Sequence, residues 1–126
     1  MYVTVSVRWL ITIAFGILVV ILSVTPGRDQ TDDSIFVWLV VNTPTLIQKL
    51  LHIAVYASLT FLLAWSLENV DPRPLRLAIA LVLAVCLGAG LEWYQTIVPG
   101  RFGTVLDILL NAAGASIGLL AALLIL

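Results

Sequence analysis

The stretch LRLAIALVLAVCLGAGLEWYQTIV, residues 75–98, decides the fold class of this chain. Between Arg76 and Glu92 it contains no charged side chain. It is long enough to cross the hydrocarbon core of a bilayer, which takes about 20 helical residues. Its last third turns polar, at Glu92 and Gln95. The stretch therefore predicts a membrane-spanning helix that carries polar side chains near one end.

The composition of the whole chain supports the same class. Of the 126 residues, 62% are hydrophobic, and the mean hydropathy is +1.16. A water-soluble domain would have too few polar residues to cover its surface. We therefore expect an integral membrane protein with one helical bundle and no separate soluble domain. The formal net charge of -1 argues against nucleic acid as a partner. The single cysteine, Cys86, cannot form an internal disulfide.

Polar turns with prolines and glycines separate this stretch from three further apolar segments of spanning length. Between the first two segments, Ile35–Val41 is too short to span and contains Trp38, which is typical of an interfacial or re-entrant segment. The predicted fold is all-α, a bundle of four transmembrane helices with this short segment between helices 1 and 2. The spans are expected at about residues 5–24, 46–67, 75–98 and 105–126.

Four spans place the N-terminus, residues 68–74 and the C-terminus on one side of the membrane. Arginines and lysines are equally numerous on the two sides, but Lys49 lies one turn inside a span and three aspartates follow Arg28. This distribution favours a cytoplasmic N-terminus. Arg8 followed by an apolar run also resembles a signal peptide, but the length of the run and the residues after it favour a retained helix.

Polar side chains gather at one end of three of the predicted spans. Lys49, His52 and Tyr56 are spaced to share one helix face. At about 1.5 Å per residue, Glu92 and Asn111 reach nearly the same depth as His52. We call this set the polar layer; its members are Lys49, His52, Tyr56, Glu92, Gln95, Arg101, Asp107 and Asn111.

Two interpretations of the polar layer compete. The residues could simply hold the helices together, with Gly114 and Gly118 letting two backbones approach closely. However, an ionisable group at the centre of a membrane helix costs about 2.5–3.5 kcal/mol. Amides and hydroxyls would join helices with less desolvation, so the ionisable residues favour a small cavity open to one leaflet. Lys49, Arg101, Glu92 and Asp107 balance one another in charge.

Within such a cavity, Lys49 and Arg101 are suited to hold an anionic headgroup. His52 is the candidate general acid or base because histidine is the residue type suited to proton transfer near neutral pH, and Glu92 or Asp107 would orient it. A metal site formed by His52, Glu92 and Asp107 is a less favoured alternative, because their spacing matches no metal motif. No cofactor is expected. The further ligand-binding candidates are Tyr56, Gln95 and Asn111.

Three groups of residues, in this order, resemble the pattern of the VanZ-like proteins, a family of small bacterial membrane proteins. They are Lys49-xx-His52-xxx-Tyr56, then Glu92-xx-Gln95, then Pro99-Gly100-Arg101-x-Gly103-Thr104-xx-Asp107-xxx-Asn111-xx-Gly114-xxx-Gly118. The resemblance covers roughly residues 46–118. Many relatives carry an acidic residue just before the lysine, where this chain has Gln48.

The resemblance implies a multi-pass protein of the bacterial cytoplasmic membrane with a role in the cell envelope. The name-giving branch is associated with low-level resistance to the glycopeptide antibiotic teicoplanin. We expect the chain to bind an anionic envelope lipid or lipid-linked cell-wall precursor at its extracytoplasmic end. One form of this hypothesis adds a chemical modification of the bound lipid. The alternative is a structural or transport subunit that forms oligomers through Gly114 and Gly118. In such a subunit the polar layer would serve as a proton or ion path, or would simply hold the helices together.

Overall fold

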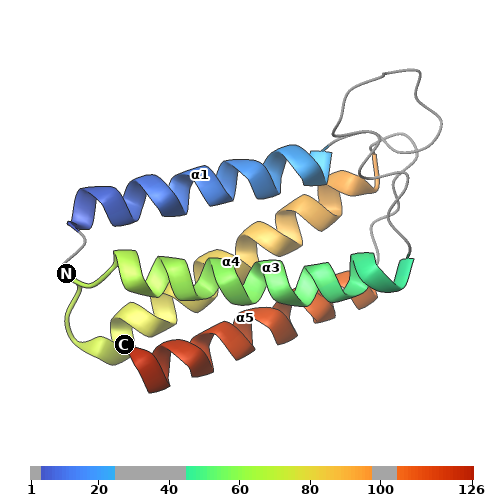
Figure 1. Ribbon diagram of the computed structural model, residues 1–126. Helices are drawn as coiled ribbons and strands as arrows, with labels where there is room; N and C mark the ends of the chain where they lie inside the picture. The colour runs from blue at the N-terminus through green and yellow to red at the C-terminus, as the bar shows by residue number, and fades with distance from the viewer. Residues whose placement is uncertain (1–3, 25–44, 98–104) are drawn as a thin grey trace.

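The computed structural model of the protein describes residues 4–24, 45–97 and 105–126. Within these ranges the chain is all-helical, with labels as in Figure 1. Each helix is long and apolar enough to cross a membrane, which confirms the predicted fold class. The helices are α1 (Val5–Val24), α3 (Thr45–Ser66), α4 (Arg73–Gln95) and α5 (Val105–Ile125). The predicted segment Ile35–Val41, and Arg101 and Thr104, lie outside the described residues.

The ends of α4 differ from the predicted 75–98 because of its flanking residues. Pro72 precedes the helix in an extended conformation, and Pro74 sits in its first turn. Proline is tolerated there because the first-turn N–H groups have no intrahelical acceptor. At the other end, the Thr96 hydroxyl donates to the Trp93 carbonyl over 2.7 Å. The helix therefore starts two residues earlier and ends three residues earlier than the hydropathy pattern predicts.

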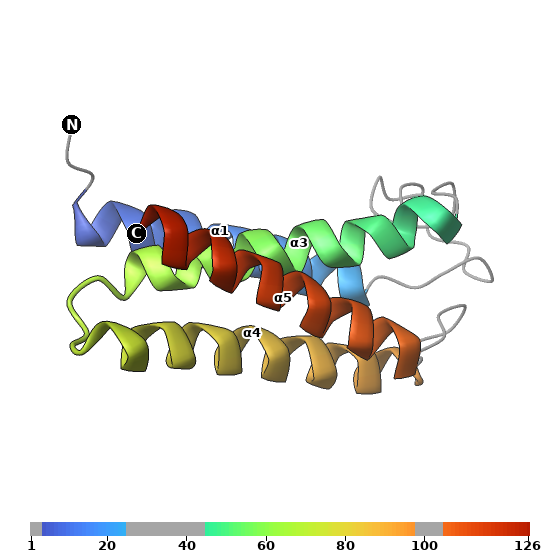
Figure 2. The same cartoon turned by 90° about the horizontal axis from the view of Figure 1, so that it is seen from below.

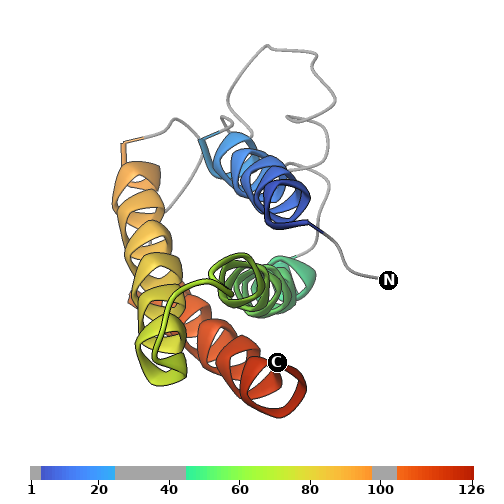
Figure 3. The ribbon, with the colours of Figure 1, turned by 90° about the vertical axis from the view of Figure 1, so that its left-hand side faces the viewer.

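Helix α3 occupies the centre of the bundle. It has its most extensive interface with α5 and also contacts α4 and α1, while α1 packs on α3 and α4. The end-on view in Figure 3 shows α3 lying between α1, α4 and α5. Figures 1 and 2 show that α1 begins and α5 ends at the same end of the bundle. The starts of α3 and α5 and the end of α4 therefore share the opposite end, as the polar layer requires.

Glycines on α5 bring its backbone against the backbone of α3. A Cβ atom added to Gly114 would collide with Ile53, reaching its Cα at 2.8 Å, and one on Gly118 would lie 2.9 Å from the carbonyl carbon of Ala57. Both contacts join residues at the same sequence offset, so α3 and α5 run in the same direction in one fixed register. Small residues permit such close packing between membrane helices. Both glycines thus have a packing role within the chain, and oligomerisation through them stays a prediction.

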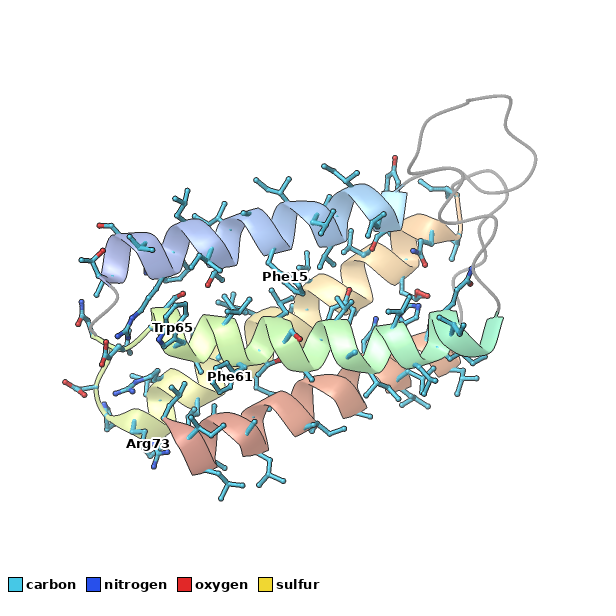
Figure 4. The ribbon with its side chains drawn as sticks, in the orientation of Figure 1. Phe15, Phe61, Trp65 and Arg73 are labelled. Atoms are coloured by element: carbon cyan, nitrogen blue, oxygen red, sulfur yellow. The ribbon has the colours of Figure 1, made fainter. Side chains whose placement is uncertain are left out.

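Small and aliphatic side chains fill the interior. Two clusters of buried residues follow the bundle axis, and alanines dominate the one farther from the polar layer. Phe15 packs against the first cluster and Phe61 against the second (Figure 4). Large aliphatic residues are exposed on the outer faces of the helices, as expected for surfaces that face lipid. The clusters are Val19, Tyr56, Leu59, Ala84 and Ala115, and Ala64, Leu77, Ala80 and Ala122.

Substitution of the two packed glycines tests whether this backbone contact fixes the bundle. We expect Gly114→Ala and Gly118→Ala to lower the free energy of unfolding by about 1–3 kcal/mol or more, because the added methyl meets backbone that cannot rotate away. Gly90→Ala is the matched control, since nothing lies within 4 Å of its Cβ position. Reversible unfolding in detergent micelles measures the difference. Equal stability of all three variants would contradict the backbone contact.

Candidate functional site

The structure brings together three ionisable side chains that are far apart in the sequence. His52 comes from α3, Glu92 from α4 and Asp107 from α5. One nitrogen of His52 and one oxygen of each carboxylate all lie within 4.8 Å of one another. Glu92 is 2% exposed, whereas His52 and Asp107 are partly buried. The three residues predicted as catalytic candidates thus form one compact cluster, although their roles stay predictions.

Asn111 orients the histidine. Nδ1 of His52 lies 2.6 Å from Oδ1 of Asn111, and the Asn111 side chain is buried. Because a carbonyl oxygen only accepts hydrogen bonds, Nδ1 carries the proton and donates it. In the neutral imidazole the lone pair is then on Nε2. Asn111, predicted as a ligand-binding residue, therefore selects the tautomer and ring position of His52.

Lys49 forms the exposed edge of the cluster. Its Nζ lies 3.8 Å from Oδ1 of Asp107, a charge contact longer than a hydrogen bond. The Lys49 side chain is 37% exposed and that of Asp107 is 16% exposed. Asp107 also lies in the first turn of α5, where the helix dipole favours a negative charge. Lys49 can thus reach toward the membrane surface while it remains attracted to Asp107.

Gly88 and Tyr56 lie on the inner side of the cluster. A Cβ at Gly88 would sit 3.0 Å from Cε1 of Tyr56 and 3.0 Å from Nδ2 of Asn111. Tyr56 is 4% exposed and belongs to the buried core, and its role in ligand binding stays a prediction. The sequence signal for Gly88 is its position one helical turn before Glu92. Its small size leaves room for the Asn111 amide between α3 and α4.

Gln95 makes its described contact elsewhere. Its Nε2 donates to the backbone carbonyl of Ser23 over 3.0 Å, at the end of α1. That carbonyl lies in the last turn of α1, where no intrahelical donor remains. Gln95 thus connects α4 to α1 at the end of the bundle that holds the cluster. Its role in ligand binding stays a prediction. Arg101 lies outside the described residues.

A second polar cluster at the opposite end was not expected. Arg8, near the start of α1, is 8% exposed and pairs with Glu68. It also donates to the Trp65 carbonyl over 3.2 Å and lies 5.0 Å from the centre of the Trp65 ring. The Thr12 and Ser66 hydroxyls are 2.6 Å apart. These contacts join α1 to the end of α3; Figure 4 labels Trp65 there.

Arg73, at the same end, contacts the C-terminus of α5. Its Nη2 donates to the carbonyls of Leu123 over 2.6 Å and of Ala122 over 3.3 Å. Both carbonyls belong to the last turn of α5, and that of Ala122 also accepts from the Leu126 N–H over 2.8 Å. Figure 4 shows Arg73 at the start of α4, next to the end of α5. The charged residues of this end therefore have structural partners, and the candidate site is the cluster at the other end.

Fold and site together define a small multi-pass helical membrane protein with an ionisable cluster at one end of its bundle. The chain matches the VanZ/LLP1 family model over residues 8–126, nearly its whole length. It belongs to the VanZ/LLP1 family and is a VanZ-like envelope membrane protein. No match was found among curated proteins or among solved structures.

Removal of the Asn111 amide tests its role beside His52. We expect Asn111→Ala to lower the free energy of unfolding by about 1–2 kcal/mol, because the Nδ1–H group of His52 loses its acceptor away from water. Ser116→Ala is the control on the same helix, since the exposed Ser116 hydroxyl bonds its own helix backbone at Ala112. Unfolding in detergent micelles measures both. An Asn111→Ala protein as stable as the control would contradict a structural role for this hydrogen bond.

Proposed function

We propose that this protein binds the headgroup of an anionic envelope lipid, or of a lipid-linked cell-wall precursor, at the polar layer. The observation that carries the proposal is the convergence of His52, Glu92 and Asp107 from three helices, with the exposed edge formed by Lys49. Ionisable side chains within membrane helices are costly and usually mark a site. Family membership supports the envelope setting.

Lys49 is the described residue best placed to contact a headgroup. Its ammonium is partly exposed, and its Nζ lies 3.8 Å from Oδ1 of Asp107. A phosphate could displace that contact at small cost, because exchange of one anionic partner for another keeps the ammonium paired. We assign Arg101 the second contact from its sequence position next to α5. The bidentate guanidinium of arginine suits phosphate geometry.

Binding accounts for the cluster without a reaction. If a bound lipid is also modified, His52 is the proton carrier, because its bond to Asn111 leaves the Nε2 lone pair to accept a proton. Glu92 and Asp107 would then stabilise the imidazolium. The proposal does not require this step, and a substrate nucleophile would have to come from the bound molecule or from water.

Mass spectrometry of co-purified lipids tests the proposal. We expect the wild-type protein to retain anionic lipid, and Lys49→Gln or Arg101→Ala to retain at least about tenfold less, the effect of losing about 1.4 kcal/mol of binding. Arg73→Gln is the matched control, because it removes a positive charge at the opposite end of the bundle. Equal loss in all variants, or none in any, would contradict a headgroup site at the polar layer.

The side of the membrane that holds the site can be tested by cysteine labelling. Cys86 is exposed and must first be replaced, so Cys86→Ser is the background. We expect Gly100→Cys to react with an impermeant maleimide added outside intact cells, and Asn69→Cys, an exposed position at the other end, to react only after lysis. Labelling of Gly100→Cys only after lysis would place the polar layer on the cytoplasmic side.

A further inference from the structure

We propose that His52, Glu92 and Asp107 bind one divalent first-row transition-metal cation, of the Mn²⁺ and Zn²⁺ class. The proposal stands without the lipid-binding function, since it concerns the three side chains themselves. They come from three helices of the bundle and present one nitrogen and two carboxylate oxygens toward a common point.

The distances fit a cation once the side chains close around it. Nitrogen and oxygen ligands lie about 2.0–2.2 Å from such a cation, so two of them in a tetrahedral site are about 3.3–3.6 Å apart. The three ligand atoms of this cluster lie within 4.8 Å of one another. Closure by up to about 1.5 Å is within the reach of rotations about the side-chain bonds of Glu92 and Asp107. The backbones of α3, α4 and α5 can therefore stay in place.

The donor set favours a transition metal over Mg²⁺ or Ca²⁺. Those two ions take oxygen ligands almost exclusively, whereas imidazole suits Zn²⁺ and other first-row cations. Two carboxylates beside the imidazole make the set harder than the sites rich in cysteine or histidine that select copper. Three protein ligands also leave coordination positions for water or for an anionic ligand, as in catalytic zinc sites.

The residues around the cluster support a ligand role for His52. A metal-bound histidine usually donates its second ring N–H to a carbonyl or carboxylate. Here Nδ1 of His52 donates to Oδ1 of Asn111 over 2.6 Å, which places the lone pair on Nε2. Asn111 is 2% exposed, so water does not compete freely for this contact. With this tautomer, Nε2 is the ring nitrogen that would bind the cation.

The local charge also favours a cation. Among the described members of the polar layer, Glu92 and Asp107 are acidic and Lys49 is the basic one. Glu92 is buried in the last turn of α4, where the helix dipole is negative and disfavours a further negative charge. A divalent cation would compensate both carboxylates. The Lys49 Nζ lies 3.8 Å from Oδ1 of Asp107 and its side chain is partly exposed, so the ammonium can move outward when the cation binds.

A bound cation would also give an anionic headgroup a contact deep in the polar layer. A lipid phosphate could occupy one open coordination position while Lys49 binds it from the exposed edge. This consequence rests on the proposed function, but the metal site does not. The two proposals therefore need separate measurements.

The test is metal binding by the full-length protein in detergent, stripped with a chelator and given no added lipid. We expect calorimetric titration with Zn²⁺ and electron paramagnetic resonance with Mn²⁺ to show one site per chain. The variants His52→Gln, Glu92→Gln and Asp107→Asn should each weaken binding more than about 100-fold, and Asn111→Ala about 10–100-fold. Asp71→Asn is the matched control, because it makes the same change at a side chain that is 88% exposed at the opposite end.

Circular dichroism identifies variants that fail to fold. If all three ligand variants fail to fold, metal binding by the wild-type protein decides the test. Folded wild-type protein that binds neither Zn²⁺ nor Mn²⁺ stoichiometrically would overturn the proposal. Binding that survives all three ligand substitutions, or that Asp71→Asn weakens equally, would overturn it as well. One metal ion per chain without retained lipid would support the metal site and contradict the lipid proposal. Retained lipid without metal binding would do the reverse.

Discussion

The backbone contact between α3 and α5 is the constraint on which the candidate site depends. Gly114 and Gly118 meet Ile53 and Ala57 so closely that neither helix can slide past the other. His52 precedes Ile53 directly, and Asn111 lies one turn before Gly114. The register fixed by the glycines therefore also fixes the hydrogen bond from His52 to Asn111. The close approach of two helix backbones, without any polar side chain, therefore determines the geometry of the polar cluster.

The charged side chains at the two ends of the bundle have different kinds of neighbours. At the end away from the site, Arg8 pairs with Glu68 and Arg73 bonds the last carbonyls of α5. These charges have a structural reason, since they join helices or complete a helix terminus. At the other end, Lys49 lies 3.8 Å from Asp107, and two carboxylates from different helices lie beside an oriented histidine. This difference between the ends identifies the candidate site more firmly than the mere presence of ionisable groups.

The depth of each polar side chain in the membrane could be predicted from the sequence, but the residues that it contacts could not. Helical rise alone places Lys49, His52, Glu92 and Asp107 in one layer, because each position follows from its distance to a helix end. Gln95 was assigned to the same layer on this basis, yet its amide bonds Ser23 of α1. Depth leaves the rotation of each helix open, so the neighbour that a side chain faces stays undetermined. Arg8 shows the same gap, since its partner Glu68 lies just beyond the end of α3.

The sequence by itself determined the class of the protein, its spanning segments and the end of the bundle that carries the polar layer. It could do so because each segment meets lipid separately, and burial in hydrocarbon depends on local composition and length. Only the tertiary structure decided that His52, Glu92 and Asp107 converge and that Asn111 orients the histidine. Those contacts depend on how α3, α4 and α5 rotate and approach one another. The approach depends on small residues such as Gly88 and Gly114, whose neighbours appear only once the helices are packed.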